Sequence, residues 1–265
     1  MYSAFQITKK FIQYYLTASS GKGHGVHSPF VYDFILHVLN DKTEYGCFDK
    51  IEDERKKLLQ NGKFIDVEDF GAGSALIKAN KRAINKIAAT SLKHLKYSRL
   101  LYRIVKHYQP YSIVELGTSF GITTAYMATA NPAGELYTLE GAPAIAEIAQ
   151  QQFDALGLQQ VHLIQGKFDD SLSKLLASVK KADLVFIDGD HRKEATLRYF
   201  EQLLSICTNS SMIILDDIHW SEGMEEAWEI VKLHPRVTLT IDLFFIGIVC
   251  LNDDIKVKQH FCIRF

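Results

Sequence analysis

From about residue 110 the chain alternates short β-branched runs with amphipathic helical patterns, and this alternation limits the fold more than any other feature. A strict β-α order predicts a parallel sheet with helices on both faces. Strands are expected at Ser112–Leu116, Leu136–Leu139, Val161–Gln165, Leu184–Asp188 and Met212–Asp216, and helices at Ile122–Ala130, Ala144–Leu156, Ser171–Val179, Lys193–Cys207 and Gly223–Leu233.

Two further β runs, Val237–Ile241 and Phe244–Leu251, follow without a helix between them. They predict an antiparallel hairpin at one edge of the sheet. The expected fold class is therefore α/β: a doubly wound, mostly parallel seven-stranded sheet with an antiparallel C-terminal hairpin.

Residues 1–109 have a different pattern, which predicts a helical N-terminal extension before a domain of residues 110–265. Ser28 and Pro29 form a helix start, with serine as the N-cap and proline at the first helical position. Further helices are expected at 49–59, 76–89 and 91–107. The glycine loop DFGAGS (Asp69–Ser74) resembles a phosphate loop but follows no convincing strand, so we interpret it as a turn before a helix.

The composition fits a globular protein. Of 265 residues, 47% are hydrophobic, and 30 Lys and Arg residues balance 31 Asp and Glu residues, which argues against disorder and against a dedicated polyanion binder. No run of 18 apolar residues occurs, so no membrane partner is expected. Met1–Leu16 has its lysines among its apolar residues, which indicates a short amphipathic helix rather than a secretory signal. Four scattered cysteines without metal-ligand spacing favour a reducing compartment, and the cytoplasm is the expected location.

The first strand of the alternating region leads into a glycine loop, VELGTSFG. Gly117 and Gly121 allow a tight turn and a close approach of the backbone to a ligand. Ser119 stands where a dinucleotide fingerprint needs its second glycine, so a pyrophosphate ligand is disfavoured. Glu115 would repel pyrophosphate and suits a ligand with a positive charge.

The second strand ends in Glu140. An acid at this strand end can accept hydrogen bonds from both hydroxyls of a ribose. The alternative is a carboxylate at the start of the helix near Pro143, and the position within the fold favours the ribose role.

Three aspartates end the fourth and fifth strands: Asp188 in FIDGDH, and Asp216 and Asp217 in ILDDIHW. Carboxylates that converge repel one another unless a cation lies between them, and oxygen ligands suit Mg²⁺ or another hard divalent cation. The alternative is that Asp216 or Asp217 caps the following helix and that Asp190 simply faces water. This alternative is favoured for each aspartate alone, but the set predicts a metal site.

His191 lies three residues after Asp188. A neutral imidazole there could accept a proton from a substrate hydroxyl as a general base. A surface histidine at a helix start is the alternative of equal weight. His219 and Trp220 could line a substrate pocket, although Trp220 could equally belong to the core.

Taken in order, VELGTSFGITTAYMA, LYTLE, ADLVFIDGDH and MIILDDIHW resemble class I S-adenosylmethionine-dependent methyltransferases. The pattern is most similar to the metal-dependent O-methyltransferases of the catechol O-methyltransferase type, whose Rossmann-like sheet also ends in an antiparallel strand. The resemblance covers about Tyr111 to Leu251. The segment HGVHSPF (His24–Phe30) extends it to bacterial methyltransferases without indicating a substrate.

The resemblance implies roles for individual residues. The cofactor, S-adenosylmethionine, would be bound by Glu115, Gly117, Thr118, Ser119, Gly121, Thr123, Glu140, Gly166, Lys167, Phe168 and Asp188. Asp188, Asp216 and Asp217 match metal ligands, with Asp217 in place of an asparagine common there. His191 matches the position of a general base, and His191 or Asp188 would take the proton. The reaction implied is methyl transfer to a hydroxyl of a small-molecule acceptor with help from a divalent cation.

Three other functions compete with this interpretation. The first is an RNA methyltransferase that binds phosphates through a basic face of residues 76–107, which has no acidic residue. The near-neutral total charge and the sequence DGDH in place of an NPPY-like loop argue against it, although nucleic acid is not excluded. The second is a non-catalytic binding module, which the set of acidic strand ends disfavours. The third is a nucleotide-dependent oxidoreductase, which Ser119 and Glu115 disfavour.

The N-terminal region is expected to shape substrate choice or a contact in a homodimer. His24 and His27 flank a glycine-rich loop, and they either contribute to a lid over the pocket or simply precede a helix.

Overall fold

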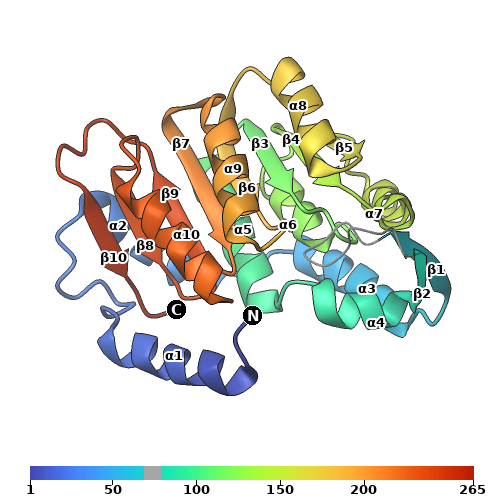
Figure 1. Cartoon of the computed structure of the whole chain (residues 1–265), viewed down its shortest axis with the longest axis horizontal. Helices are drawn as coiled ribbons and strands as arrows, with labels where there is room; N and C mark the ends of the chain where they lie inside the picture. Colours follow the sequence, from blue (N-terminus) through green and yellow to red (C-terminus); the bar gives the residue numbers. More distant parts are fainter. Residues whose placement is uncertain (69–78) are drawn as a thin grey trace. The chain divides into compact units, whose positions relative to one another are not determined.

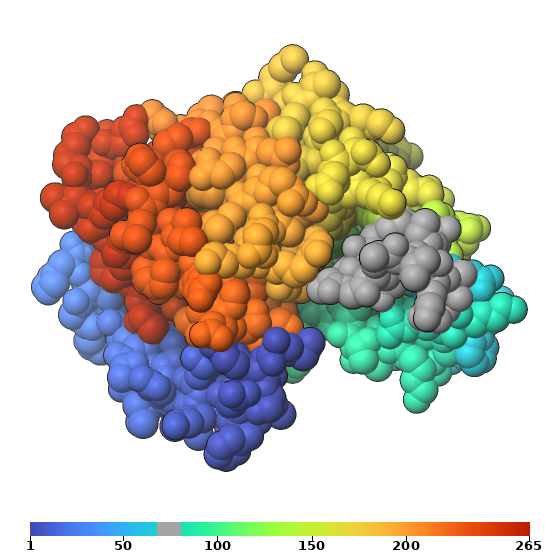
Figure 2. All heavy atoms as spheres, in the orientation of Figure 1, coloured from blue at the N-terminus to red at the C-terminus, as the bar shows by residue number. Residues whose placement is uncertain are grey.

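The computed structural model describes residues 1–68 and 79–265, so the Asp69–Ser74 loop and the start of the helix expected at 76–89 lie outside the described residues. The chain forms two compact units. The first unit combines Met1–Asp41 with Lys181–Phe265, and the second is Lys42–Lys180. Figures 1 and 2 show the elements and the heavy atoms, coloured along the sequence. The domain boundary expected at residue 109 stays a prediction.

The second unit is built on three parallel strands in the order β3-β4-β5, and it also contains the antiparallel pair β1-β2. Every residue of β3 is buried, including the polar Ser112 and the charged Glu115. Its elements are α3 (Cys47–Gln60), β1 (Phe64–Glu68), β2 (Ala79–Ala83), α4 (Ile84–Ser91), α5 (Leu95–Tyr108), β3 (Ser112–Leu116), α6 (Ile122–Ala130), β4 (Glu135–Glu140), α7 (Pro143–Leu156), β5 (Val161–Gln165) and α8 (Phe168–Ser178).

The first unit contains five strands in the order β10-β8-β9-β7-β6. Strand β6 is parallel to β7, and β9 is antiparallel to both β7 and β8. Its elements are α1 (Ala4–Thr17), α2 (Pro29–Phe34), a π-helix (Ile35–Leu39), β6 (Ala182–Ile187), α9 (Lys193–Leu204), β7 (Cys207–Asp216), α10 (Glu222–Leu233), β8 (Leu239–Asp242), β9 (Ile246–Cys250) and β10 (Gln259–Cys262).

The predicted α/β class, the mostly parallel strands and the antiparallel hairpin are confirmed. Serine 28 caps α2 as expected, since its hydroxyl accepts a hydrogen bond from the amide of Val31. The helix expected at 193–207 ends earlier, at Leu204, because β7 already begins at Cys207.

The predicted edge position of the hairpin was wrong. Strand β10 pairs in parallel with β8 and lies outside it, so strands β3 to β10 number eight where seven were expected. Its sequence, QHFC, is too short and too polar to produce a strand pattern of its own.

The N-terminal region is helical as predicted, but it also contains the hairpin of β1 and β2. The helix expected at 76–89 was wrong in part, because Ala79–Ala83 forms β2 and the helix α4 starts only at Ile84. Asp66 faces Lys81 across this hairpin. Charged residues in both strands conceal the alternation of apolar and polar residues by which a strand is usually detected.

In the described part of the chain, no helix has both the length and the apolar character needed to cross a bilayer. All four cysteines are free thiols.

Candidate functional site

The glycine loop after β3 is held against the end of β4. The amides of Gly117 and Thr118 both donate to the carbonyl of Leu139, at 3.0 and 3.1 Å. Gly117 and Gly121 have φ angles of 102° and 78°, in the region that favours glycine. A Cβ atom on Gly121 would lie 2.5 Å from the ring of Phe153, so glycine is required there for space as well as for conformation.

Glu140 fixes this loop from the end of β4. Its two carboxylate oxygens accept hydrogen bonds from the backbone amides of Ser119 and Ala142, each at 2.9 Å. Burial raises the pKa of Glu140, and the backbone donors oppose the rise. A carboxylate can accept about four hydrogen bonds, so two donors leave capacity for two hydroxyl groups of a ligand.

Glu115 is fully buried, with 0% of its surface exposed. One oxygen, Oε2, accepts hydrogen bonds from the hydroxyls of Thr124 at 2.5 Å and Thr138 at 2.7 Å. The hydroxyl oxygen of Thr138 in turn lies 2.6 Å from the hydroxyl oxygen of Thr118. Burial raises the pKa of Glu115 to about 7, although both threonine hydroxyls lower it. The other oxygen, Oε1, has no hydrogen-bond partner among the described residues.

The turn after β5 joins the same strand end. Gly166 has a φ angle of 141°, and its amide donates to the carbonyl of Glu140 at 2.9 Å. Lys167 is the N-cap of α8 and is exposed, and Phe168 is the first residue of that helix. Thr123 lies buried in the first turn of α6. Hydrogen bonds thus bring together the predicted residues Gly117, Thr118, Ser119, Glu140 and Gly166.

In the first unit, three predicted residues converge where two parallel strands end. Asp188 follows β6, and Asp216 is the last residue of β7, with only 4% of its surface exposed. One potential ligand atom from each of Asp188, His191 and Asp216 lies within 4.8 Å of the others. The pairing of Ile187 with Leu215 explains why the two aspartates are neighbours. His191 Nε2 is 3.9 Å from Asp188 Oδ1, too far for a direct hydrogen bond.

Asp217 is not among the three residues of this group. It has a φ angle of 55°, and its carbonyl accepts a hydrogen bond from the amide of Trp220 at 2.9 Å. Its predicted role as a metal ligand stays a prediction. Asp190, for which exposure to water was the simple alternative, forms an ion pair with Arg192 at 2.5 Å.

The side-chain contacts of His219 could not be predicted from its position in the sequence. Its Nδ1 lies 2.9 Å from Glu225 Oε1, and its Nε2 lies 2.8 Å from Asp242 Oδ2. Burial lowers the pKa of His219, but the two carboxylates outweigh burial and the net shift is upward. Both ring nitrogens are therefore engaged within the unit, and a role in lining a substrate pocket gains no support.

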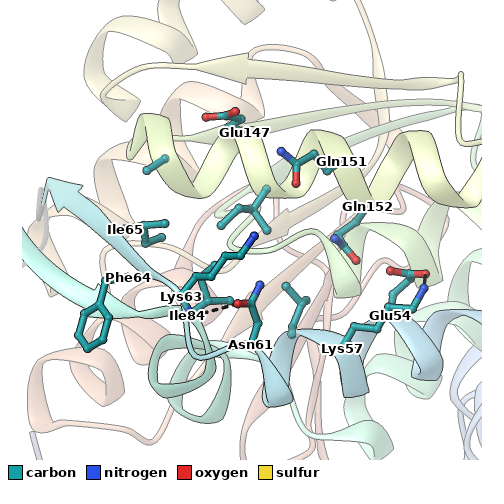
Figure 3. A pocket seen from close by; sticks show the side chains of 13 residues that line it. Glu54, Lys57, Asn61, Lys63, Phe64, Ile65, Ile84, Glu147, Gln151 and Gln152 are labelled. Atoms are coloured by element: carbon teal, nitrogen blue, oxygen red, sulfur yellow. Dashed lines mark hydrogen bonds and ion pairs between the residues drawn. The ribbon is translucent and has the colours of Figure 1, made fainter.

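A cavity of about 350 Å³ lies elsewhere in the second unit, lined by α3, α7 and the segment around β1. Figure 3 shows Glu147, Gln151 and Gln152 of α7 facing Asn61 and Lys63. None of the residues predicted for the functional site lines this cavity.

Comparison with known proteins gives a consistent result. Residues 114–218 match a family model described as a methyltransferase domain. The chain is 33% identical to a catechol O-methyltransferase of Niastella koreensis over 51% of its own length and 64% of that protein. It is 27% identical to a catechol O-methyltransferase of Mycobacterium tuberculosis over 57% of its own length and 66% of that protein. The chain thus spans slightly less than two thirds of these two relatives.

A solved structure supports the fold. The O-methyltransferase of Bacillus cereus, in complex with SAH, superposes with a TM-score of 0.54 at 24% identity, over 61% of this chain and 83% of that one. Residues 114–218 therefore match a methyltransferase domain, and over about half of its length the chain is similar to O-methyltransferases of the catechol type.

Proposed function

We propose that the chain is an S-adenosylmethionine-dependent enzyme that methylates a hydroxyl group of a small molecule. One observation carries this proposal: the segment that matches the methyltransferase domain, 114–218, contains both the loop held by Glu140 and the group of Asp188, His191 and Asp216.

The residues of the second unit fit the methyl donor. Glu140 retains acceptor capacity for the ribose hydroxyls after its two backbone hydrogen bonds. Glu115, whose Oε1 has no hydrogen-bond partner among the described residues, has acceptor capacity left below the loop. We assign Gly117, Thr118, Ser119, Gly121 and Thr123 to the amino-acid end of the donor, and Gly166, Lys167 and Phe168 to its adenine side.

The residues of the first unit fit a divalent cation. Carboxylate oxygens of Asp188 and Asp216 lie within 4.8 Å of each other, and oxygen donors of this kind suit Mg²⁺ or another hard divalent cation. We assign Asp188 and Asp216 as ligands and His191 as the general base, with Asp217 as a further ligand predicted from the sequence. When bound, such a cation lowers the pKa of a coordinated hydroxyl and orients it.

Catalysis then rests mainly on position and on one proton transfer. The loop residues and Glu140 bind the donor and fix its orientation. His191 accepts the hydroxyl proton, the new O–C bond forms as the S–C bond breaks, and S-adenosylhomocysteine is released.

The alternative functions have no comparable support from the described residues. For the RNA alternative, one cation of the basic face, Arg99, already pairs with Glu44 at 2.8 Å. The homodimer and the cytoplasmic location stay predictions.

A methyl-transfer assay tests the proposal. It measures the transfer of a labelled methyl group from S-adenosylmethionine to catechol and other hydroxylated aromatic acceptors. We expect transfer that a chelator abolishes and that Asp216→Asn lowers by about 100-fold or more, since a carboxylate ligand is lost. Asp183→Asn, which removes a partner of the exposed Lys181, is the matched control and should retain transfer. Undiminished transfer by Asp216→Asn in the presence of chelator would refute the role of the cation.

A further inference from the structure

We propose that the outer face of α1 binds the surface of an anionic lipid membrane. The helix has two apolar faces, and only one of them is used inside the first unit. Ile7, Phe11, Tyr14 and Ala18 recur at spacings of three and four residues, and they pack against Phe244, Phe245 and Cys262.

The inner face fixes α1 firmly to its unit. The rings of Phe11 and Phe244 meet edge to face with 5.1 Å between their centroids. The ammonium of Lys10 lies 2.9 Å from Glu225 Oε2, and the hydroxyl of Tyr14 donates to the carbonyl of Ile263. The opposite face of α1 is therefore held in one orientation.

That outer face is a stripe of large apolar side chains. Phe5, Ile12 and Leu16 stand at positions i, i+7 and i+11, on the side of the helix opposite Ile7 and Tyr14. Phe5 is 80% exposed and Leu16 is 75% exposed. In Figure 2 the dark blue atoms of α1 lie at the surface of the view. A stable helix that keeps such side chains in water indicates an apolar partner.

The charges around the stripe are positive. Lys9 lies on the stripe between Phe5 and Ile12, is exposed and forms no ion pair with any described residue. The guanidinium of Arg264 lies over the ring of Tyr15, at the border of the stripe. The sequence has no Asp or Glu before Asp33. Apolar side chains with cations at their border match the interface of an anionic bilayer, where lysine extends its ammonium toward the headgroups.

The same charges disfavour a second copy of the chain as the partner. A two-fold interface places the same patch of both subunits in contact. Pairing through this stripe would bring the unpaired Lys9 of each copy into one apolar contact, where like charges repel. The inference differs from the expectation of no membrane partner, because a helix that lies on a bilayer needs no spanning segment.

Sedimentation with lipid vesicles tests this proposal, whether or not the chain transfers methyl groups. The probes are vesicles of phosphatidylcholine alone and of phosphatidylcholine mixed with phosphatidylglycerol. We expect binding to the mixed vesicles only, weakened by salt. Leu16→Gln should lower the partition coefficient about tenfold, because one buried leucine side chain is lost. Lys9→Gln should lower it about fivefold.

Leu233→Gln is the matched control, because Leu233 is also 75% exposed and also lies near the end of a helix in the same unit. It should bind as the unchanged chain does, and far-UV circular dichroism verifies that all variants fold. Absence of binding to mixed vesicles, or equal loss in Leu16→Gln and Leu233→Gln, would overturn the proposal. So would a dimer in sedimentation equilibrium that Leu16→Gln dissociates, since a second copy would then occupy the stripe.

Discussion

At the scale of single residues, the buried Glu115 and the half-buried Glu140 organise the end of strands β3 and β4. Glu140 accepts hydrogen bonds from the backbone of the loop. Glu115 accepts them from threonine hydroxyls, and its Oε1 has no partner within the described part of the chain. A buried carboxylate that lacks full hydrogen bonding is costly in its charged form. The rise in the pKa of Glu115 to about 7 is the consequence.

This pKa makes stability depend on pH in a defined direction. Between pH 4.5 and about 7 the folded chain holds a proton on Glu115 that the unfolded chain has released. The contribution to the free energy of unfolding is therefore full below pH 4.5 and is lost as pH rises through 7, by roughly 3 kcal/mol in total. Glu115→Gln should remove this dependence, so that its stability relative to the unchanged chain increases from about pH 5 to about pH 8.

Urea unfolding of both chains at the two pH values measures the difference. Glu147→Gln serves as the control, because Glu147 is exposed on α7 and should leave the pH dependence unchanged. The same pH dependence in Glu115→Gln and in the unchanged chain would show that the Glu115 carboxyl titrates normally.

At the scale of elements, two glycines at helix ends have nearly the same conformation but different surroundings. Gly121 precedes α6 with a φ angle of 78°, and Gly157 follows α7 with a φ angle of 70°. A Cβ on Gly157 would meet nothing within 4 Å, whereas one on Gly121 would meet the ring of Phe153 at 2.5 Å.

Gly157→Ala should therefore cost about 1 kcal/mol, the price of a left-handed alanine. Gly121→Ala should cost about 1–3 kcal/mol more, because the Phe153 ring must move in a packed interior. Urea unfolding of the two variants measures both losses. Equal losses would mean that the contact with Phe153 does not constrain the loop.

Elements whose signal lies within their own residues could be predicted from the sequence, whereas elements that depend on a distant partner could not. Strand β3 and helix α6 have the predicted bounds because buried β-branched runs and glycine starts are local signals. Strands β1, β2 and β10 were missed because each is short, contains charged or polar residues and depends on its partner strand. Among site residues, Asp188 and Asp216 could be paired from strand order alone. The engagement of His219 by Glu225 and Asp242 could not, since it depends on three separate segments.

At the scale of the whole molecule, the first unit joins the start of the chain to its last segment. Ser19 pairs with Ile263, and the hydroxyl of Tyr14 contacts the backbone of the same residue. Helical periodicity predicted α1 and its apolar residues, but it does not specify which distant segment the helix packs against. The sequence therefore could not distinguish the inner face of α1 from the exposed one.

The proposed function requires that the loop after β3 and Glu140 bind S-adenosylmethionine, and calorimetric titration with this compound tests this binding most directly. We predict a saturable heat for one site, displaced by S-adenosylhomocysteine. Glu140→Ala should weaken the affinity about 10- to 100-fold through the loss of charged hydrogen bonds, whereas Glu147→Ala should not. A folded chain that gives no heat with either compound would contradict the account.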